Sequence, residues 1–543
     1  MRYKEVFRVL GNFLFYFSIV LIAPLFVSVY FDYIDASLSP KSTTAFLESI
    51  ISCLFLAIIF RFFSRKTTGV YYRKESVLIV VLVWVFTTII SALPFYYSKT
   101  LSDPVDCIFE SISGLTTTGA TIMCPKLYKD GKEVPYIIKN KLPHPEKDYV
   151  FFGTIKPVKD SSDKILLQGI EAVSEGILFW RSFIQWLGGL GIVVLFLTVL
   201  PALAVGGKFL LHAEMTGPIK ESVAPRIKET ASLLWKLYIG LTILEIFTLL
   251  LTNKNMQVLD AFCITFSNLS TGGFTIKNDS IAYYNSYLTE WVIIIFMFIG
   301  SINFALYFHI LKGKFFRIYE PDFLLYIAVI IIGSGVVIYT LVGAQAISLE
   351  GAENGTYNFM RALRDGTFHA ISAQTSTGFV TTDVSYWPWR TQLILLLLMY
   401  IGGMSGSTSG GIKTSRFYIL HKILKNKVES IFRPSLVRFV RIGKKQIDLN
   451  TASTVLSFFI LAFGFSIIGT LIYSFNHIDL ESSISSVACM LNNVGFAFGV
   501  AGPATSFAFM HPLSKLLSGF LMLLGRLEYF IILLLFFPMF WEK

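Results

Sequence analysis

The chain has 543 residues, of which 54% are apolar and only 15% charged, against about 25% charged residues in a typical soluble domain. This composition, with a mean hydropathy of +0.64, excludes a water-soluble globular protein, intrinsic disorder and a disulfide scaffold, since the five cysteines are few and odd in number. It predicts an all-α integral membrane protein, and the net charge of +11 then reflects basic cytoplasmic loops rather than nucleic-acid binding.

About ten apolar segments are long enough to span a bilayer, which takes about 17–25 residues. The first follows three basic residues, as a signal peptide would, but no small-residue cleavage site follows it, so we expect a retained helix. The expected spans are 11–30, 45–63, 77–97, 176–203, 231–252, 287–311, 322–345, 388–411, 452–474 and 512–540.

The distribution of lysine and arginine predicts the orientation of these spans. With the N-terminus in the cytoplasm, the inner segments hold 26 basic residues and the outer segments 17. Ten of the 17 lie in 98–170, a long segment with nine acidic residues, and long loops count little in this rule. We therefore expect a multi-pass protein of the cytoplasmic membrane with both termini inside.

Four outer loops share one pattern: a short apolar stretch that cannot span, followed by a polar run that contains glycine. Aligned on this glycine, the first three have an Asp 13 residues earlier and a Ser six residues earlier, whereas the fourth has Glu481 at 14 and Cys489 at six. The four loops are Asp106-CIFESISGLTTTG-Ala120, Asp260-AFCITFSNLSTGG-Phe274, Asp365-GTFHAISAQTSTG-Phe379 and Glu481-SSISSVACMLNNVG-Phe496.

This pattern predicts four parallel repeats of helix, short re-entrant helix, polar loop and helix, in a pseudo-fourfold arrangement after two extra N-terminal helices. Residues 1–76 hold the extra helices. The repeats occupy 77–203, which includes a polar insert near 124–170, then 204–311, 312–448 and 449–543.

Irregular backbone at membrane depth is tolerated only where it is buried or lines a water-filled path. Four such loops around one axis present rings of carbonyl oxygens, which can replace the hydration shell of a monovalent cation. We expect the acidic residue at the start of each short helix to be its N-cap, and the negative end of the helix dipole to point towards the axis. The alternative is that the loops are re-entrant packing contacts without a pore.

With these features the chain resembles the Trk/Ktr/HKT superfamily of potassium transporters, and most closely the Trk membrane subunit. The resemblance runs from about residue 77 to the end and departs from the family in the long insert and in the fourth loop, which lacks a threonine run. It rests on the four loops, Phe179-WRSFIQWLGGLG-Ile192, Pro225-RIKET-Ala231, Gly402-GMSGSTSGG-Ile412 and Gly525-RLE-Tyr529.

The resemblance implies potassium uptake through a carbonyl-lined filter, with K⁺ as the transported ion and neither a prosthetic group nor a catalytic site. In the second loop, the spacing from the upstream Asp and Ser favours Gly273 over Gly272 as the glycine that contributes to the ring. The implied filter residues are Thr117, Thr118, Gly119, Thr271, Gly272, Gly273, Thr377, Gly378, Phe379, Asn493, Val494 and Gly495.

The Gly/Ser-rich stretch 402–411 interrupts the second helix of the third repeat, and the resemblance implies that it is an intramembrane gate under the filter. A flexible helix end near the cytoplasm is the alternative. A Walker A loop is rejected, because Ile412 separates Gly411 from Lys413 and no strand precedes the stretch. The implied gate residues are Gly402, Gly403, Ser405, Gly406, Gly410, Gly411 and Arg526.

Arg526 lies in an apolar helix, where a charge is costly unless it faces a cavity or a partner. One possibility is a structural ion pair with Glu528 or Glu245. The other, which the resemblance favours, is a fixed positive charge below the filter that contacts the gate. His369, in the third short helix, is expected to be a packing residue.

The resemblance further implies a homodimer and a cytosolic nucleotide-binding regulatory subunit of the RCK type. The segment 412–448 has ten basic residues and suits either contact with anionic lipids or docking of that subunit. A secondary transporter of another solute is the first alternative function, although such folds place broken helices in inverted repeats. A cation transporter permeable to both potassium and sodium is the second, although the glycine at position 119 favours potassium by resemblance.

Overall fold

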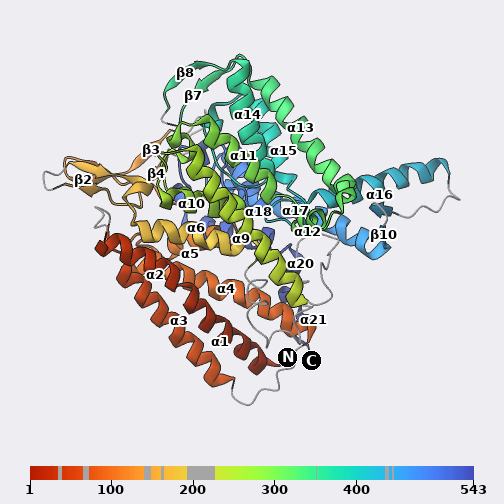
Figure 1. Ribbon diagram of the computed structural model, residues 1–543, viewed down its shortest axis with the longest axis horizontal. Coiled ribbons are helices and arrows are strands. Elements are labelled where there is room, and N and C mark those ends of the chain that lie inside the picture. The colour runs from red at the N-terminus through yellow and green to blue at the C-terminus, as the bar shows by residue number, and fades with distance from the viewer. Residues whose placement is uncertain are drawn as a thin grey trace.

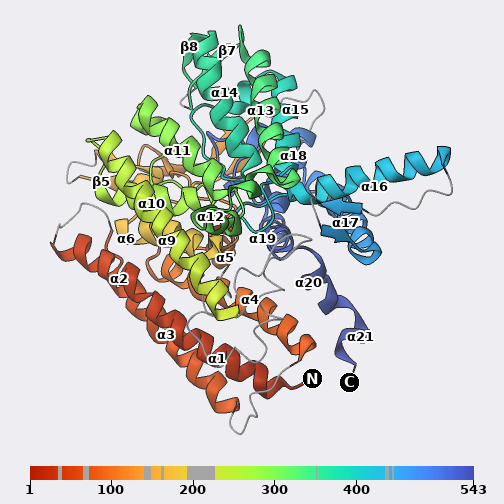
Figure 2. The same cartoon turned by 45° about the vertical axis from the view of Figure 1, so that its right-hand side comes forward.

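The computed structural model describes residues 1–34, 40–64, 72–139, 148–160, 164–191, 227–349, 351–433, 440–442 and 445–542. This part of the chain is mostly helical. Figures 1 and 2 show the N-terminal helices packed as a separate layer beside the helices of the rest of the chain. The N-terminal layer consists of α1 (Tyr3–Val20), α2 (Ile22–Val29), the π-helical turn η1 (Tyr30–Ile34) and α3 (Thr43–Phe63).

Four long helices are each followed by a short helix and then by a second flanking helix. The long helices are α4 (Arg73–Tyr97), α9 (Ile227–Thr252), α13 (Pro321–Leu341) and α17 (Leu449–Phe475). The short helices are α5 (Pro104–Leu115), α10 (Val258–Leu269), α14 (Phe359–Gln374) and α18 (Leu480–Asn492). The second flanking helices are α6 (Glu175–Gly189), α11 (Tyr287–Gly300), α15 (Trp389–Tyr400) and α19 (Pro512–Arg526).

The packing of these twelve helices closes a cycle. Within each unit the short helix contacts both of its flanking helices. Between units, α6 contacts α10, α11 contacts α14, α15 contacts α18, and α19 returns to contact α5. Each short helix is therefore held between its own unit and the preceding one.

The remaining helices extend or connect these units. The chain bends by 93° at the break between α11 and α12, and by 112° between α19 and the residues 530–536 that follow it. The elements are α12 (Phe304–Leu311), α16 (Thr414–Phe432), α20 (Phe530–Leu533), α21 (Pro538–Trp541) and the 3₁₀ turns η2 (Gly169–Ala172), η4 (Ser280–Tyr284), η5 (Phe315–Tyr319), η6 (Val384–Tyr386), η7 (Gly499–Ala501), η8 (Phe507–Phe509) and η9 (Leu534–Phe536).

Among the described residues, six helices are long and apolar enough to cross a membrane, and the number rises to eight if each bent pair is one span. Two further expected spans begin with helices of 15 and 12 residues, α6 and α15. The second half of the expected span 176–203 lies outside the described residues. So do most of 204–230, with the start of the Pro225–Ala231 motif, and parts of the insert and of 412–448. The number of ten spans therefore stays a prediction.

The insert and one other outer loop form small antiparallel hairpins. Their pairs are β1 (Leu127–Lys129) with β2 (Lys132–Val134), β3 (Tyr136–Ile138) with β4 (Tyr149–Phe151), β5 (Val158–Lys159) with β6 (Ile165–Leu167), β7 (Gln345–Ile347) with β8 (Glu353–Thr356), and on the other side β9 (Val440–Ile442) with β10 (Lys445–Ile447). Figure 1 shows β2–β4 at one end of the N-terminal helices and both chain ends at the other.

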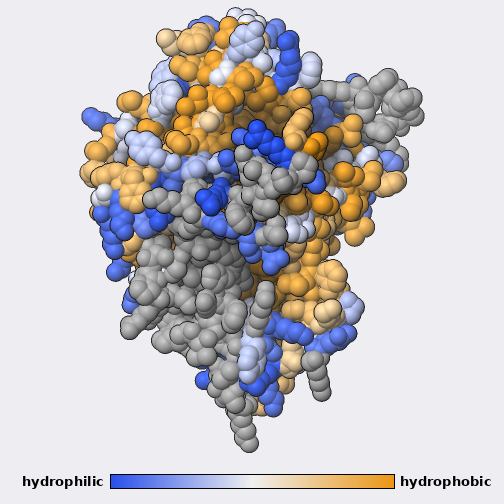
Figure 3. Space-filling view, turned by 90° about the vertical axis from the view of Figure 1, so that its right-hand side faces the viewer, coloured by the Kyte–Doolittle hydropathy of each residue, from blue (hydrophilic) through white to orange (hydrophobic). Residues whose placement is uncertain are grey.

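Hydrogen bonds join both chain ends to the first turn of α4. The Arg2 amide donates to Glu75 Oε1 at 3.1 Å, and Lys74 Nζ donates to the Glu542 carbonyl at 2.8 Å. The space-filling view of Figure 3 shows hydrophobic residues over broad areas of one face and hydrophilic residues gathered at its centre. Large exposed apolar side chains such as Phe475 and Tyr339, both 82% exposed, suit a lipid-facing surface.

The expected N-caps of the short helices are wrong. Asp106 and Asp260 lie inside the first turn of their helices, and Asp365 is further along α14. The residues that cap are Asp103, Asn358 and Asp479, whose side chains accept from backbone amides, while Gln257 precedes α10 without a side-chain cap. The helices begin earlier than the repeat pattern indicated, because capping depends on the residue before the first turn.

The three buried aspartates that do not cap have other partners. Asp106 pairs with Lys515 at 2.6 Å, Asp260 accepts from Tyr284 at 3.0 Å, and Asp365 pairs with Arg364 at 2.7 Å. The first two contacts link α5 to α19 and α10 to η4, whereas the third lies within α14.

Candidate functional site

Four glycines at the ends of the polar loops meet in a closed ring. Gly119, Gly273, Gly378 and Gly495 all have a left-handed φ, between 78° and 107°. A Cβ at the first three would overlap the carbonyl oxygen of the residue before the next ring glycine, which is Gly272, Thr377 and Val494 in turn. A Cβ at Gly495 would lie 2.7 Å from the Thr118 carbonyl oxygen and so completes the cycle.

The backbone around the glycines repeats from loop to loop. Two residues before each ring glycine, a non-glycine residue also has a positive φ of 54–57°, an uncommon conformation for such residues. These residues are Thr117, Thr271, Ser376 and Asn493. The amide of the residue before each ring glycine donates to the carbonyl six residues before the glycine, at 2.7–3.0 Å. One backbone conformation is therefore built four times.

The serine six residues before the glycine has a structural role in two loops. Ser113 Oγ donates to the Ala120 carbonyl at 2.5 Å, and Ser372 Oγ donates to the Phe379 carbonyl at 2.8 Å. We call this contact the serine clasp, because it joins the short helix to the residue after the ring glycine. It accounts for the serine in the first and third loops, whereas the Ser267 hydroxyl at the same position in the second loop is buried without a hydrogen-bond partner.

In the second loop, a glutamine side chain on the neighbouring helix α6 holds the backbone instead. Gln185 on α6 is fully buried, donates from Nε2 to the Gly272 carbonyl at 2.7 Å and accepts the Phe274 amide at 3.1 Å. A Cβ at Gly272 would collide with the Gln185 amide, so this glycine serves close packing, whereas Gly273 occupies the ring. In this geometry Gly273, and not Gly272, lies against the carbonyl of the next loop.

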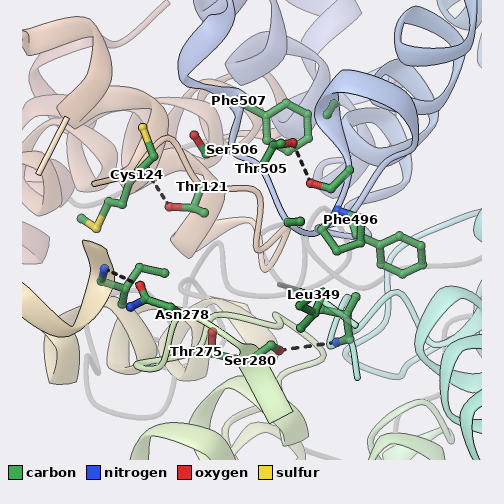
Figure 4. Close-up of a pocket in the computed structure, with 18 of the residues that line it drawn as sticks. Thr121, Cys124, Thr275, Asn278, Ser280, Leu349, Phe496, Thr505, Ser506 and Phe507 are labelled. Carbon is green, nitrogen blue, oxygen red and sulfur yellow. Dashed lines mark hydrogen bonds between the residues drawn. The ribbon is translucent and has the colours of Figure 1, made fainter. Parts of the chain in front are cut away.

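A cavity of about 320 Å³ lies on the outer side of the ring, and all four ring glycines line it. Figure 4 shows side chains from separate parts of the chain around it, with Thr121 and Cys124 on one side, Asn278 and Thr275 on another, and Phe496 opposite. Residues of the insert, including Tyr136, form part of its wall. The ring is therefore the floor of an outer vestibule.

The stretch 402–411 packs against the inner side of the four loops. Its Thr408 Oγ1 donates to the Leu269 carbonyl at 3.0 Å, its Gly410 amide to Ser376 Oγ at 2.5 Å, and its Gly411 amide to the Asn492 carbonyl at 2.9 Å. These partners belong to the second, third and fourth loops. The stretch therefore lies directly beneath them.

Arg526 links the stretch to the first loop. Its guanidinium donates to the Thr408 carbonyl at 2.9 Å, to Thr117 Oγ1 at 3.3 Å and to the Gly189 carbonyl at 2.6 Å, and it also contacts the Gly188 carbonyl. Oxygen atoms of carbonyls and a hydroxyl thus surround the charge.

The two carboxylates considered as partners of Arg526 have close partners elsewhere. Glu528 pairs with Arg416 at 2.6 Å, and Glu245 accepts from the Asn268 amide at 2.6 Å. Arg526 itself contacts Thr117, Thr408, Gly188 and Gly189, and its role stays a prediction.

A second cation at the same stretch, and a buried one, was not singled out from the sequence. Lys413, 2% exposed, donates from Nζ to the Ser409 carbonyl. The next residue, Thr414, donates from Oγ1 to Asp322 Oδ1 at 2.5 Å, which fixes the end of the stretch to α13. Lys413, the lysine of the rejected Walker A pattern, thus stabilises the stretch that precedes it.

A buried ion pair behind the first two loops was also missed. Arg181 and Glu110 are 1% and 0% exposed, and their closest charged atoms are 2.8 Å apart. Glu110 also accepts from Thr121 and from the Ile122 amide, while Arg181 donates to the Thr275 carbonyl and lies 4.1 Å from the centre of the Phe274 ring. An arginine within an apolar helix was the signal that could have found it.

The residues expected in the filter include the four ring glycines and the residues directly before them. Of those expected in the gate, Gly410, Gly411 and Arg526 contact the loops directly. Gly402 and Gly403 lie against Gly410 and Ser409 of the same stretch, and Ser405 and Gly406 contact Ser415 and Phe304. His369 is buried, its Nδ1 lies 2.8 Å from the Asp365 carbonyl, and its ring packs on Trp387. Groups of three or more His, Cys, Asp or Glu side chains suited to a metal ion are absent from the described residues.

Comparisons with known proteins give consistent matches. The family described as TrkH, cation transport protein, matches residues 164–543. The chain is 32% identical to the Trk system potassium uptake protein TrkH of Salmonella typhimurium and 30% identical to that of Halomonas elongata, with 100% of each chain covered in both cases. Its fold matches the crystal structure of the potassium transporter TrkH from Vibrio parahaemolyticus with a TM-score of 0.78 and 27% identity, again over 100% of both chains.

Replacing Arg181 by methionine should destabilise the protein strongly, because Glu110 would keep a buried charge without its arginine. We expect a loss of about 3–5 kcal/mol in the free energy of unfolding, the usual cost of breaking a buried pair. Thermal unfolding in detergent measures it. The matched control is Arg317→Met, since Arg317 pairs with Glu320 at the surface and such pairs contribute about 0–1 kcal/mol. Equal effects of both changes would contradict the assignment.

Proposed function

Because the chain belongs to the TrkH family of cation transport proteins, we propose that it takes up potassium across the cytoplasmic membrane through a pseudo-fourfold pore. The observation that carries this proposal is the closed ring of four glycines, each in contact with the carbonyl before the next. A ring of carbonyl oxygens from four loops suits a monovalent cation that loses its hydration shell. The four short helices and their flanking helices are the four repeats of this pore.

Three features favour an uptake pore over a secondary transporter of another solute. The outer vestibule opens onto the ring, the short helices end at it, and the same backbone conformation occurs four times. Negative ends of four helix dipoles near one axis favour cations over anions. Conduction by such a pore involves no covalent step, so the protein is not an enzyme in this proposal.

The stretch 402–411 is the gate of this pore. Its hydrogen bonds to the second, third and fourth loops, together with Arg526 at the first, close the path below the ring. Five glycines weaken helix formation there, at about 1 kcal/mol each relative to alanine, so the stretch can change conformation. Arg526 and Lys413 add positive charge, which lowers the local concentration of cations.

The family membership also supports an assembly with other subunits. We infer a homodimer that binds a cytosolic nucleotide-binding subunit, with both termini in the cytoplasm. The basic helix α16 follows the gate directly, and its base is fixed by the Arg416–Glu528 pair. A partner bound to α16 would therefore act close to the gate.

The direct test is uptake of rubidium, a potassium analogue, into cells that require added potassium, with sodium as competitor. Uptake that potassium inhibits far better than sodium supports the proposal. Uptake that sodium inhibits equally well supports the transporter permeable to both ions. Absence of rubidium uptake by the folded protein contradicts both.

Changing Gly378 to serine should reduce selectivity for potassium over sodium, because its side chain would overlap the Val494 carbonyl. Sodium competition against rubidium uptake measures this effect. The control is Gly343→Ser, since Gly343 has nearly the same φ, 84° against 86°, but a Cβ there has no neighbour within 4 Å. Equal competition curves for both variants would show that backbone strain alone is responsible.

Deleting Ser405–Ser409 should raise passive cation leak, because it removes the Thr408 contacts with the second loop and with Arg526. The leak is measured as rubidium efflux from liposomes that contain equal amounts of folded protein. As a control, deletion of the five residues 129–133, which span the turn at Gly131 in the outer insert, should leave the leak unchanged. A well-folded gate deletion with equal or lower efflux would reject the gate.

Replacing Arg526 by glutamine should give a folded protein with faster, less controlled potassium flux. Glutamine keeps hydrogen-bond donors near the Thr408 and Gly189 carbonyls but removes a charge that arginine carries at every physiological pH. Flux per folded molecule and thermal stability are measured together, with Lys312→Gln as an exposed control. Lost stability with unaltered flux would mean that the arginine is only structural.

A further inference from the structure

The extracytoplasmic insert is anchored to two different units of the pore. At its end, the Asn278 side chain, just after the second loop, donates to the Gln168 carbonyl at 3.0 Å and accepts the Ile170 amide at 2.9 Å. In its middle, Tyr149 on β4 reaches Asp479, the N-cap of the fourth short helix. The insert therefore spans from the second unit to the fourth across the outer mouth.

The contact between Tyr149 and Asp479 is reciprocal. The Tyr149 hydroxyl donates to Asp479 Oδ1 at 2.7 Å and accepts the Asp479 amide at 2.8 Å. Asp479 Oδ2 meanwhile accepts the Ser482 amide at 3.0 Å, which caps α18. One hydroxyl thus holds both the side chain and the backbone of the residue at which this short helix begins.

Aromatic rings extend the contact to the segment after the fourth loop. The Tyr149 ring meets the Phe509 ring edge-on with 5.6 Å between centres, and Phe151 lies 6.4 Å from the same ring. Tyr136 stacks on Phe151 at 5.1 Å and lines the vestibule. The insert therefore contacts the fourth unit both before and after the fourth loop.

The fourth loop is the only one of the four in which the residue at the position of the serine clasp is not a serine. Cys489 replaces the serine, and a thiol is a weak hydrogen-bond donor. Ser485 still binds the Phe498 amide at 3.0 Å, further along the loop. The carbonyl of Phe496 corresponds to the one that Ser113 and Ser372 hold in the first and third loops.

We propose that the insert is a brace for the fourth quarter of the filter, and that Tyr149 is a positioning residue for ion selectivity. The proposal rests on the proposed potassium function. The brace compensates for the missing clasp: it fixes the helix from which the fourth loop extends, so that Val494 and Gly495 keep their places in the ring. It also explains why a long polar insert follows the first loop yet contacts the fourth unit.

The test is Tyr149→Phe, which removes the hydroxyl and keeps the ring contact with Phe509. We expect a roughly two- to tenfold loss of discrimination against sodium, the range for one lost hydrogen bond, at nearly unchanged thermal stability. The matched control is Tyr128→Phe, because Tyr128 lies on β1 of the same insert and its side chain is exposed. Unchanged sodium competition in the Tyr149 variant would overturn the brace.

Restoring the clasp provides a rescue. Cys489→Ser supplies the hydroxyl that loops one and three use, and in the Tyr149→Phe background it should recover most of the lost selectivity. In the otherwise unchanged protein it should have little effect. A double variant as poorly selective as Tyr149→Phe alone would also count against the compensation.

Two further outcomes separate this proposal from the function on which it rests. If the unchanged protein takes up no rubidium, the potassium function fails, whatever the variants do. If it is selective and both tyrosine variants equal it, only the brace fails. Should Tyr149→Phe fold poorly, Asp479→Asn tests the same contact, since asparagine caps helices well but is a weaker acceptor for the tyrosine hydroxyl; here too, unchanged selectivity overturns the brace.

Discussion

The close approach of four backbone segments governs the rest of this structure. Each ring glycine lies against a carbonyl of the next loop, so that a side chain at Gly119, Gly273 or Gly378 would occupy the space of an oxygen atom. Backbone that approaches so closely at membrane depth needs support from every side, because it lacks regular hydrogen bonds. The short helices, the buried pair of Arg181 and Glu110, and the stretch beneath the ring provide this support.

The four units reach one backbone geometry with different side chains. Serine hydroxyls hold the first and third loops, Gln185 holds the second, and the fourth has neither. Asn493 instead donates to Thr118 of the adjacent loop at 2.9 Å and to the Met522 carbonyl at 3.0 Å. The shared constraint is thus the backbone, and the means of satisfying it have diverged.

The repeated pattern was readable from sequence because glycine, serine and threonine at fixed spacing are imposed by local geometry. The expected ring register follows from it, whereas the helical class came from composition and the expected place of the gate from the family resemblance. Contacts between residues distant in sequence were not readable. Glu110 pairs with Arg181 and Asp106 with Lys515, across 71 and 409 residues. The N-cap expectation failed for a related reason, since Asp106 is anchored by that distant lysine rather than by its own helix amides.

A mutation affects a pore built from four units of one chain differently from a pore built of four identical chains. In an assembly of identical chains, one codon change alters every quarter of the ring together. Here the residue before the ring glycine is threonine, glycine, threonine or valine, so each quarter has accumulated its own substitutions. In the pore proposed for this chain, one quarter of the ring can therefore change while the other three are preserved.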